Sequence, residues 1–217
     1  TMAVSRIAEE RNRYDSKLRK ACEIYDYCTL ISDGIREKLC VPNEKSSILS
    51  LGSDSISDKE KDFNSLRLLY VGTLSGRDLE KTIIGVSLFK QYNPNIPISY
   101  DIVGGGYNNE LEKLKLLVSN YNLQDVVTFH GPIMHDKLSK FFDSCNIGVS
   151  FIPITEYFNH QPPTKTFEYI ASGLYCLATA TLANKEVIND NNGILITDSA
   201  ESFADGIKKI WEKRNEI

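Results

Sequence analysis

The feature that most constrains the fold of this chain is an alternation, from Leu66 onward, of short apolar runs with segments of helical periodicity. The runs are candidate strands at 67–72, 98–103, 126–130, 146–151, 175–179 and 194–196. Repeated strand-then-helix units are typical of a parallel sheet with helices on both faces. The sequence therefore predicts an α/β fold with a doubly wound parallel sheet of about six strands. Ligands bind such sheets at the carboxyl ends of the strands.

Two helix starts can be predicted from capping residues. After the first strand, Ser75 and Asp78 form a candidate cap for a helix whose apolar residues lie mostly on one face. The last helix is expected to begin near Asp198, with Glu201 three residues later. Its apolar stripe closes the domain, so we expect no chemistry from it.

Composition limits the classes of function. The 217 residues can hold one full domain and part of another, and the net charge of -4 gives no basic footprint for nucleic acid. The five cysteines are an odd set without a CxxC pair, which favours free thiols in a reducing compartment, the cytoplasm, over disulfides or a zinc site. No signal peptide and no apolar run of membrane-spanning length are found.

The segment 162–169 places Lys165 and Glu168 at the start of a helix, with Pro163 expected at the first helical position. A cation in the first turn opposes the helix dipole at about 0.3–1 kcal/mol, so an anion such as phosphate is expected in front of it. Glu168 lies three residues on, on the same face, where a carboxylate accepts hydrogen bonds from vicinal hydroxyls. This pairing suits a sugar nucleotide. The alternative is a solvated Lys–Glu surface pair contributing about 0.2–0.5 kcal/mol.

The loop after the first strand repeats this pattern. It carries two glycines and then Arg77, again a cation expected in a first helical turn, and guanidinium binds phosphate oxygens bidentately. The alternative is that Arg77 pairs with Asp78 or Glu80 in solvent.

The next three loops give weaker signals. Gly104–Gly106 allow close backbone approach to a ligand, although tight turning also explains them. His130 and His135 are more often packing or capping residues than ligands, while the backbone between them could read a base. The loop at 151–162 has no evident secondary structure and is long enough to be functional or mobile. Its aromatic residues and His160 are candidates to cover a donor sugar.

Together these motifs resemble the C-terminal, donor-binding half of the family-4 GT-B glycosyltransferases (glycosyl transferases group 1), which is a Rossmann-like domain. The resemblance runs from about residue 66 to 213. Its matching pieces are Leu69–Arg77, Tyr100–Gly106, Val127–Gly131 and, above all, Pro163–Gly173.

The resemblance implies roles for these residues. In the family the basic residues hold the donor's diphosphate and the helix carboxylate holds the ribose, which assigns Arg77 and Lys165 to diphosphate and Glu168 to ribose. Backbone or hydroxyl contacts to the diphosphate are implied at Gly72, Thr73 and Thr164. Further donor contacts are expected at Lys81, Gly105, Gly106, Gly131, Pro132 and Ile133.

One position departs from the family pattern. Many members carry two glutamates spaced as E-x7-E, and the first would fall where this chain has His160. Members with Pro-(Ser/Thr)-Lys-x-x-Glu-Tyr often lack that glutamate, so the departure does not exclude activity. His160, which occupies the position, is the candidate catalytic residue. The implied substrate is a UDP- or GDP-sugar, with no metal and no other cofactor.

Residues 1–62 are expected to be a separate region from the donor-binding domain at 63–217. A charged helix at about 4–24, an apolar run at Cys28–Ile31 and a helix at 33–39 precede a polar stretch. Leu30–Leu39 resembles the last strand and helix of the GT-B N-terminal domain. The acceptor-binding half is therefore expected to be missing, and this chain to bind donor but transfer poorly or not at all.

The expected function is retaining transfer of a sugar to a saccharide or lipid-linked acceptor, commonly in polysaccharide biosynthesis. Peripheral association of the full-length protein with a membrane is left open. One alternative is a non-catalytic donor-binding subunit acting with a separate acceptor-binding partner. Another is a GT-B-fold UDP-sugar epimerase, which the Pro-Thr-Lys-x-x-Glu-Tyr pattern fits less well.

Overall fold

The structure is a computed structural model that describes residues 2–107 and 109–217, with side chains from Asn12 onward. It divides into two compact units. One comprises the chain up to Leu51 together with His160–Pro162, and the other comprises Gly52–Asn159 and Pro163–Ile217. We call the second the sheet unit and describe each unit by itself. None of the described helices combines the length and apolar content needed to cross a bilayer.

The first unit contains two helices and a short parallel strand pair. Its elements are α1 (Met2–Ile24), β1 (Cys28–Leu30), α2 (Asp33–Leu39), the 3-10 turn η1 (Asn43–Lys45) and β2 (Ser46–Ile48). The Ser32 hydroxyl caps α2 by accepting a hydrogen bond from the Ile35 backbone N–H at 3.2 Å. An ion pair of 2.9 Å between Lys38 and Asp15 joins the two helices. The sequence missed β2 because it is three residues long and lies in a polar stretch.

The sheet unit contains six parallel strands, as the sequence predicts, with ends shifted by at most a residue. They are β3 (Leu66–Val71), β4 (Ile98–Val103), β5 (Val127–Gly131), β6 (Ile147–Ser150), β7 (Tyr175–Thr179) and β8 (Gly193–Ile196). The strand order is β5-β4-β3-β6-β7-β8. The order reverses direction between β3 and β6, and a doubly wound sheet binds ligands beside such a switch point.

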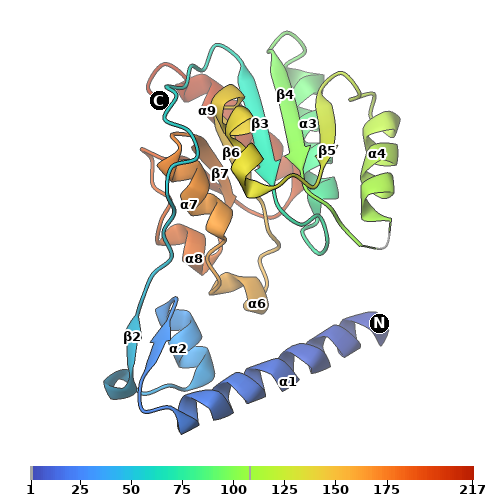
Figure 1. Cartoon of the computed structure of the whole chain (residues 1–217). Coiled ribbons are helices and arrows are strands. Elements are labelled where there is room, and N and C mark those ends of the chain that lie inside the picture. Colours follow the sequence, from blue (N-terminus) through green and yellow to red (C-terminus); the bar gives the residue numbers. More distant parts are fainter. Residues whose placement is uncertain (1, 108) are drawn as a thin grey trace. The chain divides into compact units, whose positions relative to one another are not determined.

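Helices cover both faces of this sheet (Figure 1). Leu68 and Tyr70 of β3 face one core, which is completed by α3 (Leu79–Tyr92), α4 (Glu110–Asn120) and α9 (Ala200–Lys213). Leu69 faces a second core with α5 (Ser139–Ser144) and α7 (Thr164–Ala171). Each such fully buried large side chain contributes about 1.5–3 kcal/mol. Two short elements, η2 (His135–Lys137) and α8 (Leu182–Lys185), complete the unit together with α6, described next.

The long loop after β6 contains a helical turn that the sequence analysis did not predict. This is α6 (Glu156–Asn159), and Thr155 starts it. The Thr155 hydroxyl accepts from the Phe158 N–H at 3.3 Å, and its carbonyl accepts from the Asn159 N–H at 2.9 Å. A single turn is too short to produce helical periodicity, so the expectation of an irregular loop was wrong here.

Both predicted helix caps were also wrong in detail. Asp78 is the residue before α3, but it has left-handed backbone dihedrals and its side chain makes no capping bond. The Ser75 hydroxyl instead accepts from the Tyr107 N–H at 2.8 Å, which ties two loops together. Helix α9 is capped by Ser199, which accepts from the Ser202 N–H at 3.1 Å. In both cases a predicted capping side chain binds a distant segment instead, since Ser75 bonds Tyr107 and the Asp198 carboxylate accepts from the Ile154 N–H at 2.9 Å.

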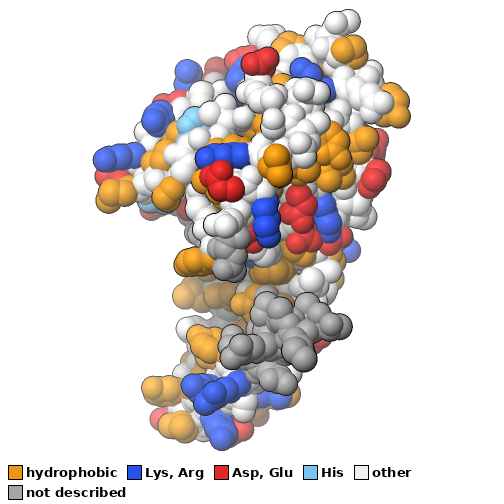
Figure 2. Space-filling model, turned by 90° about the vertical axis from the view of Figure 1, so that its right-hand side faces the viewer, with side chains coloured by type: hydrophobic (Ala, Val, Ile, Leu, Met, Phe, Trp, Pro, Cys, Tyr) orange, Lys and Arg blue, Asp and Glu red, His pale blue; other side chains and the backbone are white. Residues whose placement is uncertain are grey.

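The outer face next to α4 is mixed in charge. Figure 2 shows basic and acidic side chains interspersed over this side of the sheet unit. This face is therefore not uniformly basic.

Candidate functional site

The loops after β3, β4 and β5 pack against one another at the carboxyl ends of the strands. The Gly104 N–H donates to the Gly131 carbonyl at 2.8 Å, and the Leu74 N–H donates to the Gly105 carbonyl at 2.9 Å. Gly104 has φ +150, and a Cβ there would lie 1.8 Å from the Gly72 carbonyl oxygen. Only glycine allows this close approach of two loops.

Lys165 lies in the first turn of α7, as predicted, although Pro163 is one residue outside the helix. Its ammonium lies 3.7 Å from the centre of the Tyr70 ring, and it would be 3.8 Å from a Cβ on Gly72. Desolvation among these atoms, and then the charge of Arg77, hold the pKa of Lys165 well below its usual value. No ion pair joins Lys165 to a carboxylate among the described residues. A solvated Lys–Glu pair therefore does not describe this lysine.

Arg77 lies two residues before α3 and so is not in its first turn, contrary to the expectation. Its guanidinium carbon lies 4.6 Å from the centre of the Phe158 ring, which α6 supplies. Asp78 instead pairs with Lys81 at 2.9 Å, which raises the pKa of Lys81. Within the described part of the chain Arg77 forms no ion pair, so the predicted alternative of an Asp78 or Glu80 partner is not realised.

Glu168 faces the loop after β5. Its carboxylate Oε1 lies 3.3 Å from Nε2 of His135, and the side chain is only 14% exposed. His130 has a different role, because it pairs with Asp101 at 2.6 Å and packs against Phe141. Of the two histidines considered in the sequence, His135 is thus the one that reaches the predicted site.

Buried polar groups fix the start of α7. The Thr166 hydroxyl is 2.7 Å from the Ser150 hydroxyl and 3.2 Å from the Asn184 side-chain oxygen. The Asn184 amide donates to the Thr179 carbonyl at 2.8 Å. A buried network with all partners satisfied rigidifies its surroundings. The network therefore holds Lys165 and Glu168 in place relative to β6 and β7.

A second tie joins α7 to β3. The Tyr169 hydroxyl accepts from the Val71 N–H at 2.8 Å, directly before Gly72. The Tyr70 hydroxyl donates to the Thr73 carbonyl at 2.5 Å, which shapes the same loop. The cation of α7 and the loop after β3 are thus held in register by two tyrosines.

The remaining predicted contacts line the same edge of the sheet. Thr73 and Thr164 are exposed, and Gly105 lies beside Pro132. Gly106 lies against Glu110, one of whose carboxylate oxygens is buried without a partner. The last predicted contact, Ile133, packs on the core beneath α5 and α7.

His160 has its contacts in the first unit. Its backbone carbonyl accepts from the Ser32 hydroxyl at 2.8 Å, and its ring lies against Gly34, where a side chain would collide with it. The catalytic role assigned to His160 stays a prediction.

Two residues that shape the site were missed in the sequence: Tyr70 and Asn184. Tyr70 could have been found, because it precedes Gly72 by two residues in a strand and such residues share a face. Asn184 gives no local signal. Phe158 was among the loop aromatics expected to cover a donor sugar, and its ring lies against Arg77. Among the described residues, no three His, Cys, Asp or Glu side chains are grouped to hold a metal.

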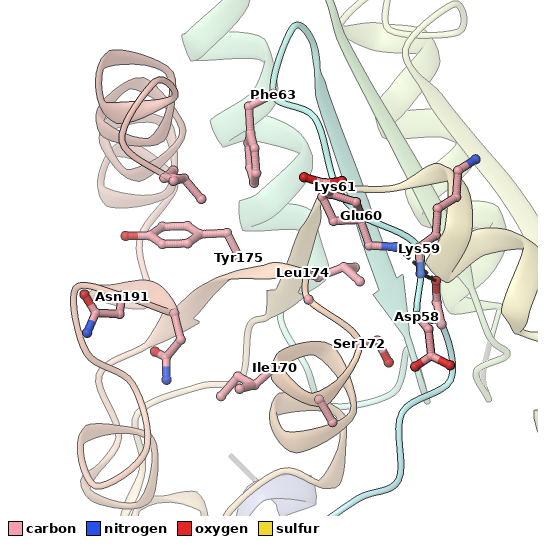
Figure 3. A pocket seen from close by; sticks show the side chains of 15 residues that line it. Asp58, Lys59, Glu60, Lys61, Phe63, Ile170, Ser172, Leu174, Tyr175 and Asn191 are labelled. Carbon is pink, nitrogen blue, oxygen red and sulfur yellow. Dashed lines mark hydrogen bonds between the residues drawn. The ribbon is translucent and has the colours of Figure 1, made fainter.

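A separate cavity of about 540 Å³ lies at the opposite, amino-terminal edge of the sheet. Phe63 and Leu174 line it just before their strands, and Figure 3 shows the side chains of residues 58–61 across the opening from Asn191. The Lys61 ammonium is bonded to the Phe142 carbonyl and the Ser57 hydroxyl. This cavity thus lies away from the clustered cations.

A sequence model of the family described as glycosyl transferases group 1 matches residues 54–216, most of the chain. The chain belongs to this family. The match includes both cations, Glu168 and the loops after β3, β4 and β5. Comparison of this group 1 chain with curated proteins gives no match.

Solved structures share the fold of this group 1 chain. They include Anabaena HepE in complex with UDP and glucose (14% identity, TM-score 0.74, 93% of this chain and 59% of that one). Sucrose-phosphate synthase from Thermosynechococcus elongatus matches at 19% identity and TM-score 0.70 over 94% and 53% of the two chains. The pneumococcal O-GlcNAc transferase GtfA, in complex with UDP and GlcNAc, matches at 18% identity and TM-score 0.72 over 93% of this chain and 41% of that one. The chain thus spans between 41% and 59% of their lengths, and its six-stranded sheet has the GT-B Rossmann-like fold.

Proposed function

We propose that the sheet unit binds the nucleoside diphosphate of a nucleotide sugar, as the donor half of a glycosyltransferase. The observation that carries this proposal is the pair of cations, Arg77 and Lys165, held at the switch point without a carboxylate partner among the described residues. Two neighbouring cations that raise each other's electrostatic energy favour a multivalent anion between them. The diphosphate is such an anion.

The rest of the donor fits the same edge of the sheet. Glu168 accepts hydrogen bonds from the ribose hydroxyls, and the backbone at Gly131–Ile133 reads the base. Gly72, Thr73 and Thr164 add contacts to the phosphates. Lys81, Gly105 and Gly106 make further contacts with the donor at the rim of this site. The structures with UDP and glucose, or UDP and GlcNAc, support this reading because their fold is the same. We propose UDP or GDP as the nucleotide.

The chemistry assigned to the site is stabilisation of a leaving group. As the bond from the sugar to the diphosphate breaks, negative charge grows on the β-phosphate. Lys165, Arg77 and the free N–H groups at the start of α7 are preorganised to receive it, because they are positive groups already held in position. The proposed outcome is transfer with retention of configuration, with His160 as the candidate residue beside the sugar.

Acceptor binding is assigned to a further domain, of which residues 1–62 are proposed to be the last part. The acceptor would be a saccharide or lipid-linked glycan, as in polysaccharide assembly. Five free cysteines support a reducing, cytoplasmic location, and membrane association would come through the acceptor half.

The test is thermal unfolding of the chain with UDP, GDP and ADP. A ligand at 100 times its dissociation constant adds about 2.7 kcal/mol, or roughly 5–10 °C in melting temperature at this size. Arg77→Ala is expected to remove the shift, and Glu168→Ala to reduce it, because the ribose contact is lost while the phosphate contacts remain. Lys140→Ala is the matched control, because its ammonium also lies over an aromatic ring, Phe141, but belongs to α5. No shift with any nucleotide, or an equal loss in the control, would argue against the proposal.

Transfer itself is tested by following the sugar. Release of a free 2-epimer from a UDP-sugar would favour an epimerase. Nucleotide binding with no transfer by the complete reading frame would favour a donor-binding subunit.

A further inference from the structure

We propose that His135 is a positioning residue that holds the Glu168 carboxylate ready for the ribose and away from Lys165. The proposal rests on the proposed function of this site. His135 belongs to the loop after β5, whereas Lys165 and Glu168, which are proposed to bind the donor, belong to α7.

The contact is between a donor and an acceptor of suitable chemistry. Nε2 of His135 lies 3.3 Å from Oε1 of Glu168, and an ionised carboxylate can only accept, so the ring N–H donates. The His135 side chain is 70% exposed, whereas Glu168 is only 14% exposed. The histidine therefore adds little to the core, while the carboxylate that it contacts is held in a confined position.

Glu168 has a competing partner on its own helix. Lys165 lies three residues earlier, on the same face of α7, and side chains at this spacing normally meet. If they paired, the carboxylate would neutralise the cation that faces the phosphates and would turn its oxygens from the ribose. The two groups instead have separate partners, since the Lys165 ammonium lies on Tyr70 and Glu168 lies against His135.

The remaining acceptor capacity of Glu168 matches a ribose. A carboxylate offers about four lone-pair sites, and His135 occupies one on Oε1. Oε2 and the rest of Oε1 can accept from the 2′- and 3′-hydroxyls of a nucleotide. Such recognition requires the carboxylate to be fixed within about 0.5 Å by groups behind it. His135 is placed to supply that constraint, and it links the base-reading loop to the ribose.

The prediction is a loss of discrimination between ribose and deoxyribose. Calorimetry would compare UDP with 2′-deoxy-UDP, and GDP with 2′-deoxy-GDP, on the full chain. In His135→Ala, affinity for the ribonucleotide is expected to fall about 5- to 30-fold. Affinity for the deoxynucleotide is expected to fall less than that for the ribonucleotide, because one of its two hydroxyl bonds to Glu168 is already missing.

Three further variants make the test specific. His135→Gln keeps an N–H donor and is expected to recover part of the discrimination. Met134→Ala alters the same loop at an exposed neighbour and is expected to leave the ratio unchanged. Glu168→Ala gives the ratio of ribonucleotide to deoxynucleotide affinity that is expected when the carboxylate is lost. Melting temperatures without nucleotide are expected to match the wild type for both His135 variants, because the ring is exposed.

The outcomes separate this inference from the proposed function. In one outcome, Glu168→Ala abolishes discrimination, while His135→Ala lowers the affinity for both nucleotides equally or leaves both affinities unchanged. The proposed role of His135 is then wrong, and the proposed function stands. If the wild type binds no nucleoside diphosphate, or if Glu168→Ala keeps the full discrimination, the proposed ribose contact fails and the role of His135 falls with it.

Discussion

Replacing Lys165 by methionine is predicted to make the unliganded protein more stable while weakening its binding of nucleotide. Lys165 is a cation in the first turn of α7, near Arg77, and desolvation holds its pKa well below the usual 10.5. These are unfavourable conditions for a charge, and a ligand-binding site commonly retains such strain. Methionine keeps the length of the side chain and its contact with the Tyr70 ring, but carries no charge.

The magnitude follows from opposing contributions. Removing the charge stabilises the folded state by about 0.3–1 kcal/mol, because the unfavourable interaction with the helix dipole is lost. It adds about 1.4 kcal/mol for each unit by which burial lowers the pKa. It forfeits a cation–π contact of about 0.5–2 kcal/mol, which a sulfur–aromatic contact of about 0.3–1.5 kcal/mol largely replaces. We expect a net gain of about 1–2 kcal/mol, or about 2–8 °C in melting temperature.

The assay is thermal and urea unfolding without ligand, followed by titration with UDP and GDP. The matched control is Lys61→Met, since desolvation also lowers the pKa of Lys61. The Lys61 ammonium, however, donates to the Phe142 carbonyl and the Ser57 hydroxyl, so its loss leaves acceptors unpaired. The control is expected to lose about 1–3 kcal/mol. A Lys165→Met protein that is less stable than the wild type, or that binds nucleotide unchanged, would refute the reasoning.

Three other outcomes are expected. Because the pKa of Lys165 is lowered on folding, the unfolded chain binds more protons, so wild-type stability should rise as pH approaches 10.5. The stability advantage of Lys165→Met over the wild type should therefore shrink over that range. A difference in free energy of unfolding by urea that stays constant with pH would contradict this. Phe158→Ala, which removes the ring beneath Arg77, should weaken UDP binding about 2- to 5-fold by calorimetry, with equal affinity as the negative result. Gly104→Ala should cost at least about 2 kcal/mol in urea unfolding, because its Cβ would meet the Gly72 carbonyl at positive φ, whereas Gly52→Ala, in open space, should be nearly neutral.

The sheet could be predicted closely because its information is local. Each apolar run between helical segments encodes one strand, and all six appear within a residue of their predicted positions. The positions that were predicted wrongly are those whose hydrogen-bond partners lie far away in the sequence. Ser75 was expected to cap α3 but accepts from Tyr107, which is 32 residues away.

The site divides in the same way. The anomalous charge of Lys165 was visible in the sequence because a helix start can be recognised locally. Its aromatic support from Tyr70, 95 positions earlier, was not, because it requires β3 and α7 to be adjacent. The pairing of His135 with Glu168 likewise depends on how the loop after β5 lies against α7. Sequence reasoning found the groups with unusual chemistry, and the fold supplied their partners.

The most direct test of the central claim is a crystal structure of this chain with UDP and, separately, with GDP. The account predicts a diphosphate within hydrogen-bonding distance of the Lys165 ammonium and the Arg77 guanidinium, with the ribose hydroxyls on Glu168. A nucleotide bound instead in the cavity lined by Phe63 and Leu174, or a diphosphate that contacts neither cation, would contradict it.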